Sequence, residues 1–216
     1  MNRSEIKELA KSKIKGNKWD IIWPMLVISV ISSIISRLMG GTVEIDFRNL
    51  ESLSNIHVSP MYYGSGLLVS LLTGIATAGY IKYLLNFVRT GKFEMNDIID
   101  TIKAKWLNIF ISQVLVTIIV FLCSLLFVIP GIIMALAYAF VIFIVIDTDT
   151  NGSDSLKASR EMMKGYKWNY FVFGLSFIGW IILVPFTLGI LLIWLYPYMT
   201  IANVIYYDKL KEINKK

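Results

Sequence analysis

The sequence has little of the chemistry that catalysis and metal binding need. Its 216 residues contain one cysteine, Cys123, and one histidine, His57, so no disulfide framework can form. It contains no HExxH zinc-protease motif, no GxSxG nucleophile elbow, and no GxxxxGK(S/T) or GxGxxG phosphate loop. His57 is interpreted as a solvated loop residue and Cys123 as a small buried one. No catalytic residue, metal ligand or cofactor is therefore predicted, and an enzyme is the least favoured class.

Charged residues are also scarce. They make up 17% of the chain, against 56% hydrophobic residues, whereas a soluble domain carries about 25% charged residues. With a mean hydropathy of +0.65, the chain cannot cover itself with polar surface, so part of its solvent must be lipid. The net charge of +6 would suggest nucleic acid in a soluble protein. Here the basic residues lie between apolar runs, so no nucleic-acid partner is predicted.

Four apolar stretches dominate the chain. A transmembrane helix needs about 20 mostly apolar residues, and residues 21–39 and 66–88 each match one crossing. The first of these lacks a small-residue cleavage site, so it is no cleavable signal peptide. The stretches 107–146 and 170–207 are each about twice as long as one crossing requires. Proline and glycine interrupt both, so each is interpreted as two spans joined by a tight turn. The alternative is one kinked helix in each place, giving four spans.

The placement of basic residues favours six spans. Basic residues prefer the cytoplasmic side of short loops, and six spans bring 19 of the 21 basic residues to one side. The predicted fold is all-α: a polytopic transmembrane helix bundle of six spans, arranged as three hairpins with short interfacial helices, both termini cytoplasmic. The predicted segments are an amphipathic helix at 1–18, a membrane domain at 19–208 with spans near 21–39, 66–88, 107–129, 131–147, 169–186 and 188–207, and a basic tail at 209–216. The predicted helix breaks are Pro130, Gly131, Pro185 and Pro197.

The segments that precede the first and third hairpins are alike. Residues 4–19 read SEIKELAKSKIKGNKW and residues 153–168 read SDSLKASREMMKGYKW, and residues 103–106 are a weaker copy. A closing glycine is a helix stop signal, and a Lys-Trp pair is typical of a chain entering lipid. The predicted interfacial anchors are Lys15, Lys18, Trp19, Lys105, Trp106, Lys164, Lys167 and Trp168. Two interpretations stay open: three repeated units, or independent selection of the same residues at each cytoplasmic entry point.

Several spaced motifs resemble one bacterial membrane family. They are Arg3-Ser4-Glu5 with Lys15-Gly16-Asn17, Pro130-Gly131 with Tyr138, Ser155 to Arg160 with Met162 to Gly165, Gly179-Trp180, Trp194 with Pro197-Tyr198, and Tyr206-Tyr207. Across nearly the whole chain they resemble the bacterial integral membrane family known as domain of unknown function 975. The resemblance implies a bacterial cytoplasmic membrane protein of about this topology. It implies no activity and carries over no catalytic residue, and it covers the outer segment 40–63 least.

A non-enzymatic accessory, assembly or protective component of the membrane is the favoured function. The spans contain almost no charge, and their polar residues Gln113, Thr117, Ser124, Ser176 and Asn203 fit helix packing. The alternative is a small transporter or channel subunit for a peptide, lipid or small solute, which six spans and proline breaks permit. Asp147, Asp149 and Asp154 lack the pattern of a calcium loop and are interpreted as helix-start and solubility residues. The expected partners are membrane lipids, with other membrane proteins or a second copy of the chain.

Overall fold

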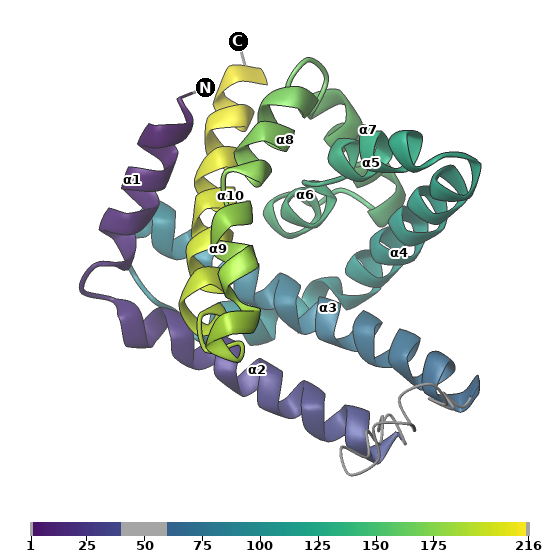
Figure 1. Ribbon diagram of the computed structural model, residues 1–216, viewed down its shortest axis with the longest axis horizontal. Helices are drawn as coiled ribbons and strands as arrows, with labels where there is room; N and C mark the ends of the chain where they lie inside the picture. The colour runs from purple at the N-terminus through teal and green to yellow at the C-terminus, as the bar shows by residue number, and fades with distance from the viewer. Residues whose placement is uncertain (1, 40–59, 215–216) are drawn as a thin grey trace.

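The computed structural model describes residues 2–39 and 60–214, and the side chains of the second range from Gly66 onward. In chain order the helices are α1 (Arg3–Ile14), α2 (Lys18–Leu38), α3 (Pro60–Thr90), α4 (Asn96–Leu126), α5 (Val128–Ala137), α6 (Val141–Asp147), α7 (Gly152–Met162), α8 (Lys167–Leu175), α9 (Ile178–Leu183), the 3₁₀ helix η2 (Pro185–Thr187) and α10 (Leu192–Asn214) (Figure 1). Every regular element in these ranges is helical, which confirms the all-α prediction. Residues 40–59 of the predicted outer segment, with His57, lie outside the described residues.

Five helical segments of the described chain are long and apolar enough to cross a membrane. They are Lys18–Leu38, Gly66–Thr90, Asn96–Leu126, Val128–Asp147 and Lys167–Thr187. The chain therefore has the membrane-like helices that its composition predicts. Helix α10, which holds the predicted span 188–207, is not among them, and its residues from Thr200 to Leu210 are mostly buried by protein.

Helix α1 packs lengthwise on α10. Asn2 caps its first turn by accepting a hydrogen bond from the backbone N–H of Ser4, 3.1 Å, and its apolar residues Ile6 and Ala10 are fully buried in the core that α10 centres. Figure 1 shows α1 and α10 side by side, running in opposite directions, with both termini at the same end. The predicted amphipathic helix is present, but its apolar face is buried by protein, because α10 offers a complementary apolar surface.

Proline in α2 is accommodated by a tyrosine of α3. Pro24 has no N–H to donate to the carbonyl of Asp20, four residues earlier, which would leave that oxygen without its helical partner. The hydroxyl of Tyr83 donates to this carbonyl at 2.8 Å, and the hydroxyl of Tyr80 donates to the next one, that of Ile21, at 2.9 Å. Helix α2 thus continues through Pro24 without a break, and these two hydrogen bonds fix α3 against the start of α2.

The break in the second hairpin lies at Phe127, three residues before the predicted Pro130-Gly131 turn. Pro130 cannot donate to the carbonyl of Leu126, so α4 ends there. Phe127 adopts an extended conformation, and α5 starts at Val128 with Pro130 in its first turn, where a missing N–H costs nothing. In the structure the hairpin consists of α4 and the α5–α6 segment, and α4 extends back to Asn96; the spans predicted near 107–129 and 131–147 fall on these helices.

Gly131 serves close packing between α4 and α5. It is buried, and a Cβ atom added there would lie 2.1 Å from Ser124 Oγ and 3.0 Å from Ser124 Cα. The hydroxyl can rotate away, but the backbone of α4 cannot. Small residues of this kind allow helices to approach closely in membranes.

Gly131→Ala is therefore expected to lower the stability of the protein by about 1–3 kcal/mol, the usual cost of overpacking. Thermal unfolding in detergent measures it. Gly179→Ala is the matched control, because Gly179 has no atom within 4 Å of an added Cβ; it should unfold at the wild-type temperature or slightly above. Equal melting temperatures for the two variants would show that α4 and α5 do not meet at Gly131.

In the third hairpin the helical structure is interrupted near Pro185, but it is not interrupted at Pro197, the second predicted break. Helix α9 ends at Leu183, η2 begins at Pro185, and Leu188 and Gly189 have positive φ angles of 50° and 81° before α10 begins. Pro197 was predicted to break a helix, and this prediction is wrong: α10 runs through it without interruption. Pro197 is buried, and packing around α10 offsets the single hydrogen bond that proline removes.

Candidate functional site

The C-terminal ends of three helices converge on one group of charges. Arg89 lies at the end of α3, Asp147 at the end of α6, and Asp208 and Lys211 in the last turns of α10. The Arg89 guanidinium forms ion pairs with both carboxylates, including 3.1 Å from Nη2 to Asp147 Oδ2 and 2.5 Å from Nη2 to Asp208 Oδ1. Lys211 forms a second ion pair with Asp147. We call these four residues the charged cluster.

Asp147 is the centre of the charged cluster. Its side chain is only 4% exposed, whereas those of Arg89 and Lys211 are 33% and 29% exposed. The hydroxyl of Tyr207 also donates to Asp147 Oδ2, at 3.0 Å. A carboxylate at the C-terminal end of a helix is unfavourable because the helix dipole is negative there. The two cations and the hydroxyl offset both this repulsion and the loss of hydration.

Lys105 adds a third cation at the end of α6. Its Nζ donates to the backbone carbonyls of Val145, at 3.1 Å, and Thr148, at 2.6 Å, and lies 3.3 Å from a carboxylate oxygen of Asp149. Lys105 was predicted to be a headgroup anchor beside Trp106. The structure instead directs its amine to the last carbonyls of a neighbouring helix, where a cation is favoured. Trp106 is 53% exposed on the continuous helix α4.

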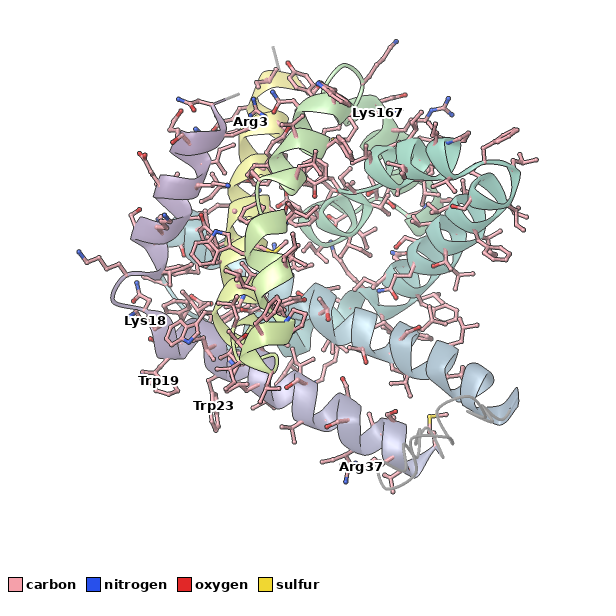
Figure 2. The ribbon with its side chains drawn as sticks, in the orientation of Figure 1. Arg3, Lys18, Trp19, Trp23, Arg37 and Lys167 are labelled. Atoms are coloured by element: carbon pink, nitrogen blue, oxygen red, sulfur yellow. The ribbon has the colours of Figure 1, made fainter. Side chains whose placement is uncertain are left out.

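The other predicted anchors form two matching turns. Gly16 ends the first turn and Gly165 the second, with φ angles of 97° and 83° that few other residues adopt. The next helix then begins at Lys18 or Lys167, with Trp19 and Trp168 75% and 73% exposed. Lys15 and Lys164 are also exposed. Figure 2 shows Lys18 with Trp19 at one edge of the molecule and Lys167 at another, so the fold does not bring the two turns together.

A cavity of about 770 Å³ is lined mainly by α3, with one residue each from α2, α4 and α6. Its lining is uncharged and its surface mostly apolar, and it includes the polar side chains of Ser36, Ser70, Thr73, Thr77 and Gln113. The amide of Gln113 lies against Gly74, where an added Cβ would be 2.4 Å from its Oε1. Gln113, interpreted from the sequence as a helix-packing residue, therefore also faces open space between helices.

Comparison with known proteins finds one protein family that matches the chain. The profile of one protein family matches the chain over residues 1–142 and 125–214, and its description is protein of unknown function (DUF975). The chain belongs to this family. The resemblance noted in the sequence is thereby confirmed. No curated protein and no solved structure matches the chain.

Sequence reasoning missed most of the charged cluster of this DUF975 protein. Asp147 was interpreted as a helix-start or solubility residue, and this interpretation is wrong, since it is the buried last residue of α6. Asp154 does lie in the first turn of α7, and Asp149 is exposed. One signal was available: Asp147 and Asp208 are each the first charged residue after a long apolar run, and Arg89 directly follows the apolar stretch 66–88. Charges of opposite sign at the ends of apolar helices are candidates for pairing, but the runs do not say which helix ends meet.

Proposed function

We propose that this DUF975 protein is a non-enzymatic accessory component of the bacterial cytoplasmic membrane, with both termini in the cytoplasm. The charged cluster is the observation that carries this proposal. It ties the ends of α3, α6 and α10 together through a buried carboxylate, and Lys209 joins α10 to α1 through Glu5 at 2.6 Å. These contacts join α1, the end of α3, α6 and α10 in one layer, a geometry suited to holding a partner in a fixed position.

The basic residues support the proposed orientation. The charged cluster, both basic turns and both termini belong to segments rich in Lys and Arg, which favour the cytoplasmic side. Helices α2, α3, α4 and α5–α6 lead away from these segments, and we propose that they cross the bilayer. Trp19, at the start of α2, then lies at the cytoplasmic boundary of the bilayer, where tryptophan is enriched.

For the third hairpin we propose an arrangement other than the two further spans that the sequence predicts. Lys209 meets Glu5 at one end of α1, and Lys18 Nζ lies 5.2 Å from the Trp194 ring at the other. These contacts are 15 residues apart on α10, or roughly 22 Å of helix. If α10 crossed the bilayer, the lysines of α1 would lie beside it in the hydrocarbon, at about 2.5–3.5 kcal/mol each near the centre. This arrangement supports a third hairpin that stays at the cytoplasmic side, its exposed apolar face in the inner leaflet.

Site-specific photocrosslinking in intact cells tests the accessory function. A photoreactive residue replacing Ile213, 40% exposed near the end of α10, should give one discrete adduct with another protein. The adduct should disappear in an Asp147→Asn background at unchanged abundance, because the end of α10 is then no longer held in place. The same photoreactive residue at Ile118, 49% exposed on α4, should crosslink to lipid alone. Equal adducts at both positions, or none at Ile213, would contradict the accessory function.

A small transporter or channel is the second candidate, favoured by the uncharged cavity that α2, α3, α4 and α6 line, with several hydroxyl groups on its surface. Binding sites in the membrane domain of transporters lie between helices in this way. This function would require the cavity and not the α10 surface. Uptake of a small uncharged solute into proteoliposomes that is abolished by filling the cavity with Thr73→Leu would therefore favour the transporter.

A further inference from the structure

A groove of about 470 Å³ lies between α1 and the third hairpin. One side is basic: Lys7, Lys11, Lys15 and Lys18 line it from α1 and the turn that follows. The opposite side is apolar and aromatic, with Trp180 of α9 and Trp194 of α10, which are 51% and 47% exposed. None of the residues that line the groove, all within the described part of the chain, is acidic.

The lysines are held at the groove by the fold. Lys7 and Lys11 are four residues apart and lie on one side of α1, beside the apolar residues that bury against α10. Lys15, which ends α1, and Lys18, which begins α2, line the same groove. Lys7 Nζ donates to the carbonyl of Ser176 at 3.0 Å and lies 4.5 Å from the centre of the Phe177 ring. Lys18 Nζ lies over the Trp194 ring. Such cation–π contacts anchor an ammonium group without neutralising its charge.

Crowding of like charges makes the groove receptive to an anion. Burial, and then the positive charge of Lys11, lowers the pKa of Lys7. An anion among these ammonium groups would relieve that repulsion. The proposed orientation puts Lys18 and Trp19 at the cytoplasmic headgroup layer, so the groove opens where phospholipid phosphates lie and its aromatic side faces the acyl chains.

We infer that this groove binds one anionic membrane phospholipid, with its phosphate among Lys11, Lys15 and Lys18 and its acyl chains along Trp180 and Trp194. Basic pockets beside apolar helices on the cytoplasmic side are suited to such headgroups. The inference rests on the proposed orientation and goes beyond it. A defined site retains one lipid molecule per protein, whereas general attraction to an anionic surface retains no fixed number.

The third unit supplies a matched comparison within the same chain. In the alignment of residues 4–19 with 153–168, Lys11, Lys15 and Lys18 correspond to Arg160, Lys164 and Lys167. These also line a pocket, but that pocket contains Glu161, and all its lining residues come from α7, α8 and the turn between them. This second pocket has the three equivalent cations, but no other hairpin supplies an apolar side opposite them. The inference therefore predicts retained lipid at the first turn and not at the second.

Native mass spectrometry of the full-length protein in mild detergent tests the inference. The probes are dioleoyl phosphatidylglycerol, dioleoyl phosphatidylcholine and inorganic phosphate. Wild type should bind one phosphatidylglycerol at least about tenfold more tightly than phosphatidylcholine. Replacing Lys11, Lys15 and Lys18 together by glutamine should weaken this binding on the order of 10-fold to 100-fold. Replacing Arg160, Lys164 and Lys167 by glutamine removes the same charge and should weaken it less than about threefold.

Three outcomes would overturn the inference. Equal loss in the two triple variants would show diffuse attraction, equal affinity for both lipids would show an apolar groove alone, and competition by inorganic phosphate at matched concentration would show a site for free phosphate. If the first triple variant does not fold, Lys11→Gln with Lys15→Gln, both exposed, should still weaken binding about tenfold. Arginine at the same three positions should retain it. These lipid affinities are measured in detergent and do not depend on which side of the membrane the third hairpin lies. A negative result for lipid binding can therefore be distinguished from an error in the proposed orientation.

Discussion

Replacing Asp147 by asparagine is expected to lower the melting temperature of the detergent-solubilised protein by roughly 5–10 °C. Asparagine keeps the shape of the side chain and removes its charge, so Arg89 loses one partner and Lys211 loses its partner in the described structure. Breaking a fully buried ion pair costs about 3–5 kcal/mol. Because Arg89 and Lys211 are about a third exposed, water replaces part of the interaction, and about 2–3 kcal/mol is expected.

Asp149→Asn is the matched control for this result. Asp149 lies two residues further along, has a fully exposed side chain and meets only Lys105 in the described structure, so its replacement should leave the melting temperature unchanged. A double-mutant cycle with Arg89→Met sharpens the measurement: Arg89→Met and Asp147→Asn together should cost less than the sum of the single variants, because the residues interact directly. Identical melting of the Asp147 and Asp149 variants would show that the charged cluster does not hold the helix ends together.

A cysteine at Leu188 is expected to be protected from an impermeant maleimide on intact cells, in a Cys123→Ser background. Leu188 lies at the tip of the third hairpin and is 91% exposed in the protein itself, so only its position relative to the membrane can protect it. The tip lies at the end of α10 that meets Lys18. With the lysines of α1 in the cytoplasmic headgroup layer, the tip cannot be on the outer surface.

Two further cysteines complete the topology experiment. Phe127, in the α4–α5 turn and 74% exposed, should label on intact cells, and Asn151, between α6 and α7, should not. All three should label after solubilisation, which shows that the thiols are reactive. Labelling of Leu188 on intact cells would support the six-span prediction over the proposed arrangement and require α1 to leave α10. Labelling of Asn151 would overturn the orientation itself.

Much of the fold could be predicted because it depends on local chemistry. The length of each apolar run determines where helices can cross a bilayer, and the Lys-Gly turns before α2 and α8 depend on a glycine that tolerates positive φ. The break at Phe127 was within reach of the same reasoning, since Pro130 removes the helical partner of the Leu126 carbonyl. The prediction placed the turn on the proline and glycine themselves. In the structure the proline begins the second helix, and the glycine packs against Ser124.

The sequence by itself determined that the chain is all-helical and apolar enough for a membrane, that most of its basic residues lie between its apolar runs, and that it belongs to the DUF975 family. Only the tertiary structure decided which helix ends meet. Arg89, Asp147 and Lys211 are far apart in sequence, and apolar helices carry no local signal that says which face meets which neighbour. The docking of α1 on α10, and with it the lysine-lined groove, depends on that packing, because a lysine's role is determined by what its long side chain can reach.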